Sequence, residues 1–199
     1  PNYSVSKAYQ IMTEGHYSQL PVVDSDNKLI GLVTEKLLAE VNPSSATSLS
    51  VYEINYLLSK TKVQDIMKTG IFKINKDALI EDAAIIMKEN RISSLPVVEG
   101  DNYLAGIITR TDIFKAFIDI MGVKATGTRI AITTEDKVGV LADITSILAQ
   151  HNINIRNITD ISENGKSEIT IKVRSLDATA AVEDINAKGY NVTSVITVH

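Results

Sequence analysis

The sequence of 199 residues lacks cysteine, and this absence excludes disulfides, a thiol nucleophile and a cysteine-ligated zinc site. It also lacks a basic surplus: 20 Lys and Arg stand against 24 Asp and Glu, for a net charge of -4. This balance argues against a nucleic-acid partner. No apolar run approaches the roughly 20 residues that span a bilayer. No secretory signal is visible, so we expect no membrane partner and a cytoplasmic protein.

Motifs for catalysis are missing as well. The three histidines, His16, His151 and His199, are far apart and follow no metal-ligand spacing. There is no glycine-rich phosphate loop and no Gly-x-Ser-x-Gly sequence. We therefore predict no enzyme, no metal and no catalytic cofactor. An active site assembled from distant residues stays open as an alternative.

What the chain does contain is an internal repeat. Residues 2–37 align without a gap on residues 77–112, and about 14 of roughly 36 positions are identical. The shared core is Ser18 with Leu20–Val23, which corresponds to Ser93 with Leu95–Val98. A repeat of this size predicts two copies of one supersecondary unit, packed face to face.

Each copy ends in a strand–helix junction, and the second is Gly106–Asp112. Thr109 and Asp112 are spaced so that the hydroxyl and the carboxylate lie together at a helix N-terminus. The carboxylate could accept hydrogen bonds from sugar hydroxyls, and the backbone N–H groups could bind an anion. Thr-x-x-Asp also resembles a capping box, which merely satisfies the helix end. The first copy has Leu37 where the second has Asp112.

Hydrophobic spacing predicts the same element order in both copies. In the first we expect a helix at 3–14, strands at 20–23 and 29–33, and a helix from Thr34. A breaker-rich linker at 42–48 and a helix at 50–58 follow. The second copy starts earlier, at Val63–Met67, with a strand at 70–74, a helix at 79–90, strands at 95–98 and 104–108, and a helix at 112–121. The first copy has no counterpart of 63–74, so we expect a fragment that lacks roughly a dozen N-terminal residues.

The pattern changes after Gly122. Strands are expected at 129–134, 152–161, 167–173 and 190–198, with an Asn-Gly turn at 163–166. A helix with Leu141, Ile144, Ile147 and Leu148 on one face precedes the second strand, and a helix at 177–188, with Ala181, Val182 and Ile185 inward, ends at Gly189. The order βαββαβ predicts a four-stranded antiparallel sheet with both helices on one face.

These motifs resemble known families. The Ser-x-Leu-Pro-Val-Val strands and the Gly-h-h-Thr-x-x-Asp junction resemble the CBS domain, two of which form a Bateman module. The tail, with Asp136–Leu141 in its first turn, resembles the ACT domain. The implied fold class is α+β: tandem CBS repeats of the βαββα type plus a ferredoxin-like βαββαβ ACT domain. The expected domains are 1–41 (CBS repeat 1), 42–62 (linker with helix), 63–122 (CBS repeat 2), 123–127 (linker) and 128–199 (ACT). The order is similar to that of bacterial acetoin utilisation proteins, which implies a related role.

The CBS resemblance implies an adenosyl ligand between the repeats: AMP, ADP, ATP or S-adenosylmethionine, with a cyclic dinucleotide as runner-up. Carried over, Asp112 binds the ribose, and the first copy, with Leu37, has a weak or empty site. The other implied contacts are Tyr17, Ser18, Gln19, Leu20, Ser93, Ser94, Ile108, Thr109 and Thr111. Candidate phosphate contacts are His16, Arg91 and Arg110.

The ACT resemblance implies pairing of two chains and an amino acid bound near the first turn. The candidates are Asp136, Lys137, Val138, Gly139, Val140 and Leu141, with Asn152 and Asn154 nearby. Alternatively, Gly139 and Leu141 only allow close packing of helix on sheet. Together the resemblances imply a homodimeric regulatory ligand sensor acting on an unidentified protein. The alternative is a structural or interaction module with vestigial clefts.

Overall fold

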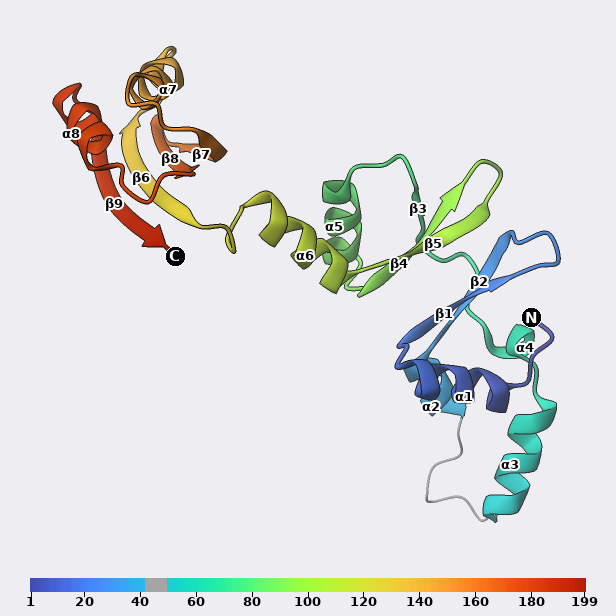
Figure 1. Cartoon of the computed structure of the whole chain (residues 1–199). Helices are drawn as coiled ribbons and strands as arrows, with labels where there is room; N and C mark the ends of the chain where they lie inside the picture. Colours follow the sequence, from blue (N-terminus) through green and yellow to red (C-terminus); the bar gives the residue numbers. More distant parts are fainter. Residues whose placement is uncertain (42–49) are drawn as a thin grey trace. The chain divides into compact units, whose positions relative to one another are not determined.

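The computed structural model describes residues 1–41 and 50–199, which form two compact units, Pro1–Ile113 and Phe114–His199. Both units combine helices and strands, which confirms the α+β class (Figure 1). The linker expected at 42–48 lies outside the described residues. The boundary between the units falls within one helix, α6.

The first repeat contains the elements that its sequence predicts. Helix α1 (Val5–Gly15) is capped by Ser4, whose Oγ accepts from Lys7 N, and it ends where His16 takes a φ of 53°. Strands β1 (Gln19–Val23) and β2 (Leu29–Thr34) form the expected antiparallel hairpin. Helices α2 (Glu35–Val41) and α3 (Val51–Lys60) follow.

The second repeat has the same order, preceded by a short helix and a short strand. Its elements are α4 (Val63–Ile66), β3 (Ile74–Asn75), α5 (Ile80–Glu89), β4 (Ser94–Glu99), β5 (Tyr103–Thr109) and α6 (Arg110–Ile120). The strand predicted at 70–74 is wrong in extent. Only Ile74 and Asn75 pair, in parallel, with Val97 and Val98 of β4. Gly70 has a φ of +63° and Phe72 is exposed, so the apolar run before Ile74 has neither strand pairing nor a core to cover.

Hydrogen bonds between the two hairpins follow the repeat. Asn27 Nδ2 donates to Leu104 O, and its counterpart 75 positions on, Asn102, donates from Nδ2 to Leu29 O. The backbone bonds Leu29 N to Asn102 O and Leu104 N to Asn27 O are equally reciprocal. Because each contact occurs twice with the roles exchanged, the repeats are related by an approximate two-fold axis within the chain.

The segment that begins the second repeat packs into the first. Val63 is buried in the first repeat's core, and Ile66 and Met67 pack against it. Lys68 exchanges backbone hydrogen bonds of 2.9 Å with Leu32 on the outer edge of β2. Sequence periodicity places this segment with the second copy, but its apolar side chains are buried in the neighbouring one.

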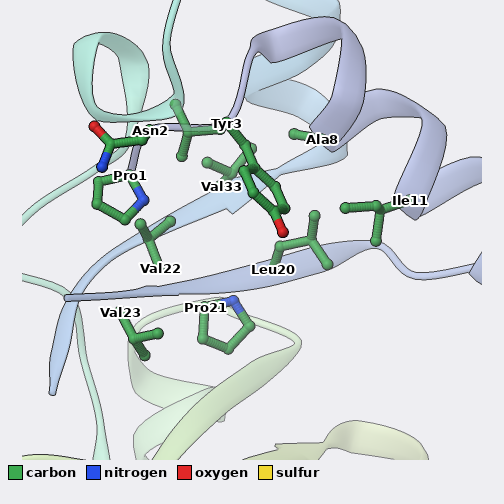
Figure 2. Close-up of a pocket in the computed structure, with 11 residues that line it drawn as sticks. Pro1, Asn2, Tyr3, Ala8, Ile11, Leu20, Pro21, Val22, Val23 and Val33 are labelled. Atoms are coloured by element: carbon green, nitrogen blue, oxygen red, sulfur yellow. The ribbon is translucent and has the colours of Figure 1, made fainter. Parts of the chain in front are cut away.

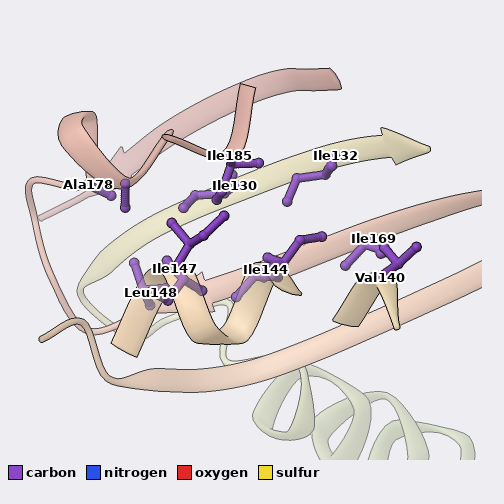
Figure 3. Packing of buried hydrophobic residues seen from close by; sticks show 12 residues of the cluster. Ile130, Ile132, Val140, Ile144, Ile147, Leu148, Ile169, Ala178 and Ile185 are labelled. Carbon is purple, nitrogen blue, oxygen red and sulfur yellow. The ribbon is translucent and has the colours of Figure 1, made fainter. Parts of the chain in front are cut away.

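The second unit is the predicted four-stranded antiparallel sheet. Its elements are β6 (Gly127–Glu135), α7 (Val140–Gln150), β7 (Ile155–Glu163), β8 (Lys166–Val173), α8 (Thr179–Ala187) and β9 (Asn191–Val198), with strand order β7-β8-β6-β9. Both helices contribute to one core, in which Ile144 of α7 and Ile185 of α8 join Ile130 and Ile169 of the sheet (Figure 3). The sheet therefore carries both helices on one face.

Two details of this unit differ from the prediction. Leu141 is 38% exposed, and Val140 takes its place on the buried face of α7. The second strand begins at Ile155 rather than at 152, because Asn152 has a φ of 55° after the end of the helix. The turn at Asn164–Gly165 is confirmed: both residues have positive φ, as a two-residue type I′ hairpin requires.

Candidate functional site

Thr109 and Asp112 meet at the start of α6. Asp112 Oδ2 accepts from Thr109 N at 2.8 Å and from Thr109 Oγ1 at 2.6 Å. Asp112 N donates in return to Thr109 Oγ1 at 3.2 Å. This is the reciprocal capping box that the spacing predicts. The same contacts hold a carboxylate in a fixed position at a helix N-terminus, so the geometry satisfies both interpretations of the motif.

The first repeat has half of this arrangement. Leu37 N donates to Thr34 Oγ1 at 3.1 Å, but the isobutyl side chain of Leu37 cannot accept a bond from Thr34 in return. The two junctions are otherwise equivalent: Glu35 N donates to Ser18 O, and Arg110 N donates to Ser93 O. The first junction therefore keeps the backbone contacts and lacks the carboxylate.

Predicted ligand contacts from the two repeats meet at Gln19. Its Nε2 donates to Ser93 Oγ at 3.1 Å, and its Oε1 accepts from Ser94 Oγ at 2.6 Å. Ser94 is buried, whereas Ser93 is exposed. Since Ser93 O also accepts from Arg110 N, this network joins the start of β1 to the junction that carries Asp112.

The remaining predicted CBS contacts lie near the ends of these elements. His16 and Arg91 are equivalent residues that end α1 and α5, and each has a φ of 53°. The Arg110 guanidinium donates to Ile92 O at 3.1 Å, just before β4 begins. Tyr17, Ser18 and Thr111 are exposed, and Leu20 and Ile108 are half-buried.

A cavity of about 430 Å³ lies in the first repeat, and Asp112 is not among its lining residues (Figure 2). Of the predicted contacts, Leu20 alone is among its lining residues. Ile11, Val22 and Val33 make its walls apolar. In the second repeat Val97 and Val98, the counterparts of Val22 and Val23, are paired with β3. The sequence does not predict this cavity, because the residues that line it have the pattern of an ordinary core.

The candidate ACT site is a cavity of about 320 Å³ at the turn before α7. All six candidate residues from Asp136 to Leu141 line it; Asn152 and Asn154 do not. Sequence reasoning missed Asp160 and Ser167, which are hydrogen bonded to each other on the adjacent strands β7 and β8. Their sequence distance from the turn does not predict this position, because the antiparallel pairing of the strands brings them to the cavity.

The turn is shaped by Gly139 and one ion pair. Gly139 has a φ of +98°, and a Cβ there would meet no atom within 4 Å, so backbone conformation rather than close packing requires glycine. The Lys137 ammonium bonds to Glu135 and lowers the pKa of that carboxyl. Val138 is fully exposed. The turn therefore lines the cavity with a glycine in the left-handed region and with Lys137, whose ammonium is paired with Glu135.

Comparison with known proteins matches the two repeats and the C-terminal sheet unit to domain families. The CBS domain family model matches residues 1–42 and 63–119, and the ACT domain model matches 128–190. The chain is 34% identical over 137 residues to the chloroplastic CBS domain-containing protein CBSX1 of Arabidopsis thaliana. That match covers 60% of this chain and 58% of CBSX1, less than two thirds of the relative's length.

Two solved structures resemble the same region. CBSX2, also of Arabidopsis thaliana, was solved in complex with AMP; it is 30% identical, with a TM-score of 0.51, over 61% of this chain and 86% of that one. A putative acetoin utilization protein (AcuB) from Vibrio cholerae is 26% identical, with a TM-score of 0.50, over 61% of this chain and 82% of that one. Among the described residues, no helix has the length and hydropathy to cross a membrane.

Proposed function

Because the chain belongs to the CBS domain family and carries an ACT domain after its two CBS repeats, we propose that it is a regulatory sensor of an adenine nucleotide. Both domain types are regulatory modules. The observation that carries the proposal is the network in which Gln19 of one repeat bonds to Ser93 and Ser94 of the other, beside the junction of Asp112. AMP is the first candidate ligand, since CBSX2 binds it.

The proposed contacts follow from the chemistry of the ligand. A ribose presents two adjacent hydroxyl donors, and a carboxylate accepts up to about four hydrogen bonds, so Asp112 can cap α6 and bind ribose together. The base would lie against Ile108 and the backbone of Tyr17–Leu20. Thr109 and Thr111 would bind near the ribose or phosphate. Arg91 and Arg110 would supply positive charge for the phosphate, and His16 would be a further contact.

One nucleotide per chain is the expected stoichiometry. At the equivalent junction Leu37 cannot accept from ribose hydroxyls, and burying them without partners would cost about 1–3 kcal/mol. The first-repeat site would therefore be weak or empty.

Sensing requires that the ligand favour one arrangement of the protein over another. We propose that the chain forms a homodimer in which nucleotide binding changes the geometry of the CBS pair. The ACT domain would contribute to dimerisation and bind an amino acid through the turn at Asp136–Leu141. The signal would pass to an unidentified protein partner. Similarity to AcuB favours a role related to acetoin utilisation.

The test is calorimetric titration of the full chain with AMP, ADP, ATP, S-adenosylmethionine and cyclic di-AMP. We expect saturable binding of an adenosyl ligand at one per chain. Asp112→Ala should abolish it. Asp119→Ala, a carboxylate farther along α6, is the matched control and should leave it unchanged. A preference for cyclic di-AMP would instead identify a cyclic-dinucleotide sensor.

A purely structural role is the alternative, because the bonds between Asp112 and Thr109 suffice to cap α6. Asp112→Glu separates the two roles. Glutamate at this position is the usual capping-box residue, and Glu53 plays that part in α3. We expect this variant to keep its stability and to lose most nucleotide affinity, because the carboxylate is displaced. Absence of binding by every ligand in the wild-type chain would favour the structural role.

A further inference from the structure

Two cations face each other on the side of the ACT sheet opposite its helices. Ile171 and Val173 of β8 point into the core, so strand alternation turns Thr170 and Lys172 to the other face. On β6 the pattern is the same, and Arg129 is the direct partner of Lys172 across the strand pair. Side chains in such a pair have Cβ atoms about 4.5–5.5 Å apart, and like charges there are destabilising.

Lys172 is buried, with 5% of its surface exposed. Its Nζ donates to Gly127 O at 3.4 Å, a long bond to a neutral acceptor. Within the described part of the chain, neither Lys172 nor Arg129 forms an ion pair with a carboxylate. A buried ammonium beside a guanidinium is costly unless a negative charge accompanies it.

A cavity of about 150 Å³ lies over this pair. The segment Met121–Val123 closes one side, and it is held there because Asn157 Nδ2 donates to Ile120 O at 3.0 Å. None of the nine lining residues is acidic: they are Met121, Gly122, Val123, Arg129, Asn157, Thr170, Lys172, Ile196 and Val198. A water occupies about 30 Å³ in the liquid, so the cavity holds a group of a few heavy atoms.

We propose that this cavity binds a small oxyanion, a phosphate or a short carboxylate, between Lys172 and Arg129. The Arg129 guanidinium supplies a planar pair of donors, the Lys172 ammonium a point charge, and the Thr170 hydroxyl a further donor. Ile196 and Val198 add apolar walls to the cavity. The site lies on the opposite face of the sheet from the helices and shares no lining residue with the cavity at Asp136–Leu141.

The test is thermal unfolding of the full chain with increasing inorganic phosphate, and separately acetate, at an ionic strength held constant with sodium chloride. We expect a saturable rise in Tm with one of the two anions, and the stronger response identifies the anion class. Amide hydrogen exchange in the same titration should slow in 127–135 and 166–173, which distinguishes this site from phosphate bound between the CBS repeats.

Variants test whether the response to the anion comes from this cavity. Lys172→Met removes the buried charge, so we expect a higher Tm without anion and no response to it. Lys166→Met, an exposed lysine on the same strand, is the matched control and should respond as the wild type does. Arg129→Gln alters an exposed side chain and tests the site even if Lys172→Met fails to fold. An unchanged response in both site variants, or no response to either anion in the wild-type chain, would overturn the proposal.

Discussion

Two glycines at equivalent positions of the CBS repeats have different surroundings. A Cβ on Gly31 would lie 2.6 Å from Met67 Sδ and 3.0 Å from Lys68 O, because the segment after α4 covers β2 there. A Cβ on Gly106 would meet nothing within 4 Å. Neither glycine has a positive φ, so steric contact rather than backbone conformation decides what each position tolerates.

We therefore expect Gly31→Val to destabilise the CBS unit by about 1–3 kcal/mol, the usual cost of overpacking. Gly106→Val should change stability by no more than about 0.5 kcal/mol, as an exposed substitution does. Urea unfolding of the two variants measures the difference. Equal losses would show that both glycines serve the hairpin itself rather than the contact with Met67 and Lys68.

The sequence predicts residue roles where the local pattern is sufficient. The spacing of Thr109 and Asp112 predicted the capping geometry. The weak or empty ligand site expected at Leu37 stays a prediction. The pattern cannot separate a cap from a ribose contact, because both use the same carboxylate in the same place. The exposure of Leu141 was missed because Val140 and Leu141 are adjacent and equally apolar, and only the angle at which α7 lies on the sheet selects one.

At the scale of helices and strands, most of the correct predictions came from the internal repeat. Alignment of the copies located both hairpins and the helix after each, since side-chain periodicity and turn residues are local signals. The segment Val63–Met67 shows where local signals end. Its apolar residues require a core, but which repeat supplies that core depends on the path of the chain in space. Similarly, Ile71 and Phe72 are apolar enough for a strand, yet only Ile74 and Asn75 find a partner.

One polar cluster joins α7 to the residues that directly follow α8. Asp143 of α7 accepts from Tyr190 Oη at 2.7 Å and from Lys188 Nζ at 3.2 Å. The bond from Tyr190, followed by that from Lys188, lowers the pKa of the Asp143 carboxyl below its ordinary value of 3.8. Because the folded-state pKa is the lower one, this contribution to stability is complete above the unfolded-state pKa. It is lost as pH falls through the folded-state value.

We therefore expect Asp143→Asn to destabilise the ACT unit at neutral pH and to make little difference at acidic pH, below the folded-state pKa of Asp143. Urea unfolding of variant and wild type across the acidic range gives the difference at each pH. Asp184→Asn is a suitable control on α8, since Asp184 has its own partner, His151. A difference between Asp143→Asn and wild type that does not shrink with falling pH would mean that the carboxylate charge is not what stabilises the cluster.

At the scale of the whole molecule, burial is divided among separate cores. The CBS repeats have one cluster each, around Val33 and Leu95, and the ACT sheet has its own around Ile144. A ligand that binds the folded form of one unit stabilises that unit by mass action. The division into two compact units therefore predicts that ligand effects on stability are local.

We expect AMP to raise the stability of Pro1–Ile113 and to leave that of the ACT unit unchanged. At a hundredfold excess over Kd the gain would be about 2.7 kcal/mol. Amide hydrogen exchange of the full chain measures it: slow-exchanging amides of β1, β2, β4 and β5 should become slower with AMP, while those of β6 and β8 keep their rates. In the Asp112→Glu variant, AMP should no longer slow exchange in β1, β2, β4 and β5. Slowing in β6 and β8 as well would mean that the units unfold together, and nucleotide binding would then be coupled to the ACT domain through stability itself.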